Sequence, residues 1–193
     1  GNNTYTGDTT IKAGTLKLGA SGGIGNSPNI IVGDTGSSGA VLDTTAQAGF
    51  TVGTGQTLKG IGTVNVGSAN TLTVNGTHSP GTSPGVQSVI GGLTYGANAI
   101  FNWELTANTS AQGGSPDFTF DQVNLTGALT ITSGATINIL LNAPGSTVDF
   151  SDAFWNYDQS WDIFTGASGV SGNFVIHTIT GDMDGMLSGS EHP

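Results

Sequence analysis

The ten residues from Gly76 to Gly85 hold two Ser-Pro-Gly units, and they constrain the fold more than any other stretch. Each proline fixes φ near −65° and has no N–H, and each following glycine can adopt a positive φ. Proline followed by glycine suits the central positions of a type II turn, and the serine before each proline is driven toward extended backbone. Two such turns in tandem form a stiff corner that no helix can cross. Strand-like segments lie on both sides of it, at 71–74 and at 86–90.

The composition favours many short strands joined by tight turns. Glycine accounts for 33 of the 193 residues, while charged residues make up only 8% of the chain, about a third of the usual share. The polar remainder is mostly threonine, serine and asparagine, so the chain differs from disordered segments, which couple low hydrophobicity to high charge. Threonine and valine suit pleated strands, whereas glycine and asparagine suit turns. We therefore expect an all-β protein.

Charge and residue counts exclude several classes of function. The formal net charge is −10, from 13 acidic residues against three lysines and no arginine. Such a chain cannot neutralise a run of phosphates, so we expect no nucleic-acid partner. Cysteine is absent, which excludes disulfides, thiolate metal sites and cysteine nucleophiles. No apolar run reaches the roughly 20 residues that span a bilayer, so we expect no membrane insertion in this segment.

The spacing of the strand-like segments favours a solenoid. Short segments recur about every 8–12 residues in the first half of the chain, which by itself allows a sandwich, a barrel or a solenoid. The segments are shorter than the usual strand of about 5–6 residues, and several connections are one glycine or a pair containing glycine. We therefore predict a parallel β-helix with coils of about 20 residues. A β-sandwich is the alternative.

We expect a single domain over residues 1–193, with three regions. Residues 1–85 should form repeat-like coils of short strands, and residues 86–180 should form coils of longer strands that end in an aromatic region. The segment 107–116 should protrude as a loop, since it is rich in Gly, Ser, Asn and Pro. Residues 181–193 should form a tail with little to bury.

The segment from Asn3 to Gly19 resembles the autotransporter-associated β-strand repeat of bacterial surface proteins. Leu58–Val64 followed by His78–Gly85 is similar to a second element of those proteins, G-x-G-T-V and then P-G-x-S-P-G, and the resemblance extends loosely over 92–174. It implies a right-handed single-stranded parallel β-helix, secretion, and a place on or beyond the bacterial cell surface. The first repeat follows the pattern N-x-Y-x-G-x-T-x-I-x-x-G-x-L at Asn3, Tyr5, Gly7, Thr9, Ile11, Gly14 and Leu16.

An aromatic cluster near the C-terminal end is dense for a chain with 7% aromatic residues. A solenoid must cover the apolar face and the unpaired edge of its last coil, so we interpret this cluster as a cap, with sugar stacking as the alternative. The cluster contains Phe150, Phe154, Trp155, Tyr157 and Trp161. The candidate contact residues are three from this cluster and three from the first repeat: Trp155, Tyr157, Trp161, Asn3, Tyr5 and Ile11.

The titratable residues give little support for catalysis. Asp117 and Asp121 lie four residues apart, a spacing that places both on one face of a strand. Glu104 lies in a strand and alternates outward, and His78 lies in the Pro-Gly corner, where we expect an exposed loop residue. We therefore predict no enzymatic activity, no catalytic residue and no cofactor.

Metal binding has one weak candidate site near the C-terminus. Asp182 and Asp184 are separated by one residue and precede a glycine, and carboxylate oxygens are the ligands that Ca²⁺ prefers. The pair lacks the further ligands and the terminal glutamate of an EF-hand loop. Solvated surface charge is the ordinary interpretation of these residues, so we assign no metal.

We interpret the chain as an extracellular structural protein of a bacterium. In the first mechanism it is the protomer of a surface filament or matrix, which grows when edge strands of one copy pair with those of the next. In the second, it is an adhesin passenger fragment that binds a host or carbohydrate surface. A polysaccharide-active enzyme is the third and least supported alternative. The expected partner is therefore the chain itself, and the expected location is extracellular or at the cell surface.

Overall fold

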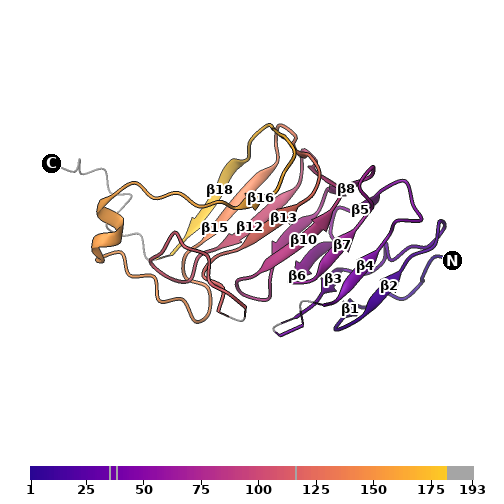
Figure 1. Ribbon diagram of the computed structural model, residues 1–193, viewed down its shortest axis with the longest axis horizontal. Coiled ribbons are helices and arrows are strands. Elements are labelled where there is room, and N and C mark those ends of the chain that lie inside the picture. The colour runs from indigo at the N-terminus through magenta and orange to yellow at the C-terminus, as the bar shows by residue number, and fades with distance from the viewer. Residues whose placement is uncertain (35, 38, 116, 182–193) are drawn as a thin grey trace.

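The computed structural model describes residues 1–34, 36, 37, 39–115 and 117–181. Over these residues the chain coils through three sheets of short strands. Within each sheet, the strands of successive coils lie side by side from the N-terminal to the C-terminal end (Figure 1). Every pairing between named strands is parallel, for example β7 with β10 and β8 with β11. The predicted parallel β-helix is therefore confirmed. The β-sandwich alternative is wrong, because sandwiches are built from antiparallel strands.

Each turn of the coil contributes strands to the sheets in the same order. The seven-stranded sheet contains β1 (Thr9–Ile11), β3 (Asn29–Val32), β6 (Thr57–Gly60), β9 (Thr77–Pro80), β12 (Ile100–Glu104), β15 (Thr136–Leu140) and β18 (Val175–Thr180). The six-stranded sheet contains β2 (Thr15–Lys17), β4 (Val41–Asp43), β7 (Thr63–Asn65), β10 (Val86–Ile90), β13 (Gln122–Leu125) and β16 (Phe164–Thr165). The five-stranded sheet contains β5 (Phe50–Val52), β8 (Thr71–Val74), β11 (Gly92–Tyr95), β14 (Leu129–Ile131) and β17 (Val170–Ser171).

Alternation along each short strand places one row of side chains in the interior, where equivalent rows stack from coil to coil. In the six-stranded sheet, Leu42, Val64 and Val89 are in register and 0–1% exposed. Full burial of an aliphatic side chain of this size contributes about 1.5–3 kcal/mol. The interior stack of the seven-stranded sheet runs through Ile30, Leu58, His78, Phe101 and Ile137.

The longest coils lie nearest the C-terminus. Leu58 and its register partner His78 are 20 positions apart, as predicted, whereas Ile137 and Ile176 are 39 positions apart. Two segments leave the coil to produce this difference. The first closes on an isolated antiparallel bridge between Leu105 and Phe120, and the second runs between β15 and β16 and contains the short 3₁₀ helix η1 (Ala153–Asn156).

Four aromatic rings fill the interior where the longer coils begin. Each of these rings contacts the other three, and the residues are Tyr95, Phe101, Phe164 and Phe174. The closest pair is Tyr95 and Phe174, whose ring centroids are 4.9 Å apart. Rings at such separations, in edge-to-face and offset arrangements, add to the stabilisation from burial. This interior group is distinct from the aromatic cluster between Phe150 and Trp161.

The corner between β9 and β10 is shorter than the sequence indicates. The first Ser-Pro pair extends strand β9 through Pro80, so the turn itself covers only residues 81–85. Gly81 has a φ of +85° and Ser83 a φ of +131°, the only positive φ of a non-glycine residue among the described residues. The solenoid continues across this corner, since β7 and β8 pair with β10 and β11.

Candidate functional site

His78 is buried in the core, and its predicted exposure in a loop is wrong. The residue lies in the interior row of β9 and is 0% exposed. Its Nε2 lies 2.8 Å from Oε1 of Gln87, and its Nδ1 lies 2.6 Å from the hydroxyl oxygen of Tyr95. The side chains of Thr77–Pro80 alternate between half-buried and buried, as a strand requires. The turn residues that follow hide this strand in the sequence.

The hydrogen bonds of Gln87 determine the tautomer of His78. Nε2 of Gln87 donates to the carbonyl oxygens of Lys59 and Gly60, so its Oε1 must accept from the imidazole Nε2–H. The imidazole Nδ1 is then free to accept from the Tyr95 hydroxyl. Burial lowers the pKa of His78 to about 4. A neutral, fully hydrogen-bonded imidazole in the core is a structural group and has no access to a substrate.

Asp121 and Glu104 lie together beside the corner, although the sequence did not pair them. Asp121 is 0% exposed, and Oδ1 accepts from the N–H of Gly85 at 2.8 Å while Oδ2 accepts from the N–H of Glu104 at 3.0 Å. Burial raises the pKa of Asp121 well above 3.8, and the charge of Glu104 raises it further. The prediction that Asp117 and Asp121 share a strand face is wrong, since Asp117 is exposed and lies outside any strand.

Glu104 is half-buried, so the prediction of an outward side chain is only partly right. Burial raises the pKa of its carboxyl group, and a hydrogen bond from the Ser83 side chain opposes that rise. Its Oε2 is buried and has no hydrogen-bond partner. Such an atom is unusual in a native protein and indicates either a protonated carboxyl group or a functional role.

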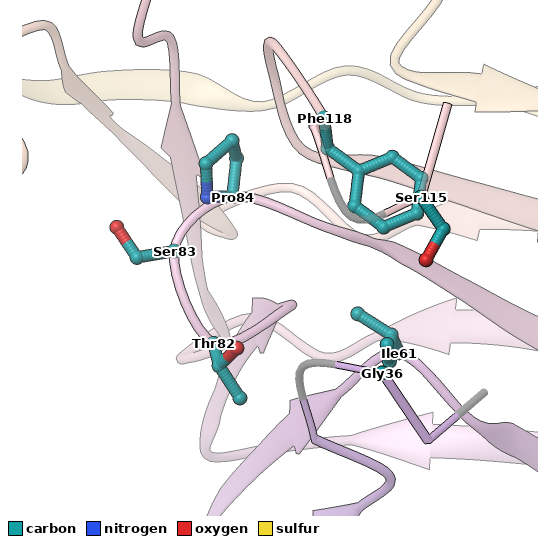
Figure 2. A pocket seen from close by; sticks show the side chains of 7 residues that line it. All are labelled: Gly36, Ile61, Thr82, Ser83, Pro84, Ser115 and Phe118. Carbon is teal, nitrogen blue, oxygen red and sulfur yellow. The ribbon is translucent and has the colours of Figure 1, made fainter. Parts of the chain in front are cut away.

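A small cleft lies on the outer side of the corner. Figure 2 shows Thr82, Ser83 and Pro84 of the corner on one side of it and Ser115 and Phe118 of the 106–120 segment on the other. Its volume is about 50 Å³, which accommodates a water molecule or two but no sugar ring. The cleft is therefore too small to serve as a ligand site in this conformation.

The N-terminal contact candidates belong to the first coil, where side-chain hydrogen bonds connect the residues before β1 to the strand and to the turn that follows. The Ser27 hydroxyl donates to the carbonyl oxygen of Gly7. Since its hydrogen is used there, it accepts from the Thr9 hydroxyl at 2.6 Å. The Thr9 hydroxyl in turn accepts from the Tyr5 hydroxyl at 2.6 Å. Asn3 is exposed, and its N–H donates to the carbonyl oxygen of Gly23. Ile11 is 6% exposed, so its side chain belongs to the core and offers no contact surface.

The aromatic contact candidates differ in exposure. Tyr157 is 76% exposed, whereas Trp155 and Trp161 are half-buried and pack against the core. Trp155 Nε1 donates to Asn108 Oδ1 at 3.1 Å, and Trp161 Nε1 donates to the carbonyl oxygen of Thr109 at 2.8 Å. Because both indole N–H groups are used internally, neither can donate to a sugar hydroxyl.

The cluster covers only part of the C-terminal end and leaves an apolar cavity of about 260 Å³ beside β18. The two indole rings form one wall, and β12, β15 and β18 contribute most of the remainder. The lining residues are Trp103, Ile137, Ile139, Leu141, Trp155, Trp161, Ile163 and Ile179.

The last strands form an open apolar end. Ile176 continues the interior stack of Phe101 and Ile137 but is 58% exposed, and Val170 continues the stack of Leu129 but is 66% exposed. Strands β16, β17 and β18 are each the edge strand of their sheet. Among the described residues, unpaired backbone groups and exposed apolar side chains therefore occur together at this end, a combination that favours strand addition.

No metal centre emerges from the part of the chain that is described. Within it, no group of three or more His, Cys, Asp or Glu side chains is placed to hold a metal ion. The calcium candidates Asp182 and Asp184 lie outside the described residues, as does the tail from residue 182 onward.

The helical structure found within the described residues is too short to cross a membrane. No family model, no curated protein and no solved structure matches the chain.

Proposed function

We propose that this chain is a structural β-solenoid of the bacterial cell surface or extracellular space, and that its copies associate end to end. The observation that carries this proposal is the open C-terminal end, where apolar Val170 and Ile176 lie exposed on unpaired edge strands. The resemblance of residues 3–19 to autotransporter-associated repeats supports the extracellular location.

The partner proposed for this end is the N-terminal end of a second copy. Strands β1 and β2 of the first coil are the opposite edges of two of the three sheets, so a second copy placed head to tail extends both with parallel pairing. Such a heterologous contact does not close on itself and produces a filament.

Charge also favours the head-to-tail arrangement over a contact between two C-terminal ends. The first coil contains the exposed Lys12 and Lys17 against one aspartate, Asp8, and Lys17 pairs with Asp43 of the next coil. The segment beside the C-terminal end contains four aspartates and no lysine, so two such ends would repel each other. The four aspartates are Asp149, Asp152, Asp158 and Asp162.

Sedimentation velocity and electron microscopy over a range of protein concentrations test this proposal. We expect filaments or head-to-tail oligomers of the unmodified chain, and Ile176→Lys should raise the concentration needed for assembly by about tenfold or more, because each 1.4 kcal/mol of contact energy is a factor of ten. The matched control is Ile90→Lys, since Ile90 is 37% exposed but lies on β10 within a sheet.

Two results contradict the proposal. One is an unmodified chain that stays monomeric at the highest attainable concentration, which would mean that any further coil comes from the same polypeptide. The other is an equal loss of assembly in Ile176→Lys and Ile90→Lys. That result would mean that an added lysine weakens assembly wherever it lies on the surface. Circular dichroism of both variants verifies that they remain folded.

A further inference from the structure

The corner at 81–85 is held by a carboxyl group that belongs to a distant part of the sequence. Asp121 accepts the N–H of Gly85 with one oxygen and the N–H of Glu104 with the other, at 2.8 Å and 3.0 Å. Trp103 Nε1 donates to the backbone carbonyl oxygen of Asp121 at 2.9 Å, which fixes the backbone of that residue. Asp121 thus joins the corner, strand β12 and the end of the 106–120 segment.

The second carboxyl group approaches the same corner from β12. Glu104 accepts a hydrogen bond from the side chain of Ser83 at the tip of the corner, while its Oε2 is buried and unpartnered. Ser83 itself has a φ of +131°, a region that a residue with a Cβ occupies only when its surroundings hold it there. Glu104 and Asp121 together provide that hold.

The surrounding elements supply no positive charge to this pair. The corner, β13 and β15 contain no titratable side chain, and the 105–120 segment adds only the exposed Asp117. On β9, which pairs with β12, the titratable residue is His78, which is buried and neutral. On β6, Lys59 lies in register with Ser79. Among the described residues the one salt bridge joins Lys17 to Asp43.

We propose that Glu104 and Asp121 form a pH-controlled latch on the 81–85 corner. When the pair holds one proton, it carries a single negative charge. The donors that stabilise this charge are the Gly85 N–H, the Glu104 N–H and the Ser83 side chain. When that proton leaves, two like charges lie together without a cation. The bond between Asp121 and Gly85 N–H then breaks more often, Ser83 relaxes toward an ordinary φ, and the corner moves away from Ser115 and Phe118 across the cleft.

The direction of the pH dependence follows from the two pKa shifts. Burial raises the pKa of both carboxyl groups in the folded protein, so the folded chain holds this proton more tightly than the unfolded chain does. The stabilisation is therefore complete in acid and is lost as the pH rises through the folded-state pKa values. The latch is closed at low pH and opens at higher pH.

Amide hydrogen exchange measured by NMR tests the latch at the amide of Gly85. In the unmodified chain, we expect the protection factor of Gly85 to fall by about tenfold per pH unit in the range where the closed corner still holds the shared proton and the open corner does not, because one proton is then released per opening. The N–H of Gly92, which donates to the carbonyl oxygen of Asn70 in another sheet, is the internal reference and should keep a constant protection factor.

Three variants separate the latch from a merely structural role. Glu104→Gln removes the second charge and should make Gly85 protection independent of pH. Ser83→Gly should move the loss of protection to higher pH, because the Ser83 bond that lowers the pKa of Glu104 is gone. Asp117→Asn, a change of an exposed carboxyl group in the adjoining segment, should leave the profile unchanged.

Two outcomes overturn the proposal: constant Gly85 protection in the unmodified chain, or the same pH profile in Glu104→Gln as in the unmodified chain. If Glu104→Gln does not fold, the Ser83→Gly profile decides, and a profile that is unshifted or shifted to lower pH excludes the latch. None of these outcomes depends on end-to-end association, because each is measured on a monomeric sample.

Discussion

At the scale of single residues, the His78 network links the stability of the solenoid to pH. The imidazole has an ordinary pKa of 6.5 in the unfolded chain and a pKa of about 4 in the folded chain. Below pH 6.5 the unfolded chain therefore binds a proton that the folded chain does not. The stabilisation from this residue is complete above pH 6.5 and is lost as the pH falls toward 4. The Glu104 and Asp121 pair acts in the opposite direction.

His78→Gln isolates this contribution, since glutamine can accept from Tyr95 and donate to Gln87 without titrating. Relative to this variant, we expect the free energy of unfolding of the unmodified chain to decrease by up to roughly 3 kcal/mol between pH 6.5 and 4. Urea unfolding at a series of pH values measures the difference. Parallel curves for the two proteins would show that His78 does not titrate differently in the folded and unfolded states.

At the scale of elements, the two-residue connection between β6 and β7 requires glycine at position 62. A Cβ there would lie 2.5 Å from the carbonyl oxygen of Ala40 and 2.7 Å from that of Val32, both in the preceding coil. Because backbone atoms form this contact, no side-chain movement can relieve it. Successive coils thus approach each other closely at a corner that the sequence marks only as Gly-Ile-Gly.

Gly62→Ala should destabilise the solenoid by roughly 1–3 kcal/mol, the range for overpacking in a close-packed interior. Gly19→Ala is the matched control, because a Cβ at Gly19 has no atom within 4 Å, and it should change stability by less than about 0.5 kcal/mol. Chemical unfolding midpoints of the two variants provide the comparison. Equal midpoints would mean that adjacent coils separate at little cost.

The strands were predicted more accurately than their connections. The predicted segments 71–74 and 86–90 coincide with β8 and with β10, because period-two alternation is a local signal. The sequence of Trp161–Phe164, with apolar residues at its first, third and fourth positions, also predicts a strand, yet β16 begins only at Phe164. Trp161 is directed instead by a tertiary contact, the bond from its Nε1 to Thr109, which lies 52 residues earlier and leaves no local trace.

At the scale of the whole molecule, the two ends of the solenoid differ. At the N-terminal end the hydroxyl chain from Tyr5 to Gly7 holds the first residues in place, and the apolar side chains of Leu18 and Ile24 are covered, with 4% and 2% exposed, although β1 and β2 remain edge strands. The C-terminal end leaves Val175 and Ile176 more than half exposed. In a solenoid each coil is stabilised mainly by its neighbours, so an end with exposed apolar side chains opens more easily than one whose apolar side chains are covered.

Hydrogen exchange followed by mass spectrometry should show this asymmetry. In a monomeric sample we expect amides of β18 to exchange fastest among the paired strands, those of β1 more slowly, and those of β6–β8 slowest, since central coils open only with global unfolding. Uniform protection from β1 to β18 would contradict a coil-by-coil stability. Assembly should slow exchange in β18 specifically, provided that this edge is the contact between copies.

The sequence by itself determined the architecture of this protein, because glycine corners and period-two alternation act over a few residues and permit only short strands in a coil. It also determined the near-absence of cationic and thiol chemistry. The tertiary structure decided which polar groups are buried together. His78 meets Tyr95 across 17 residues, and Asp121 reaches Gly85 across 36. Such pairings depend on coil length and register, which are set by packing between coils and not by the residues beside each group.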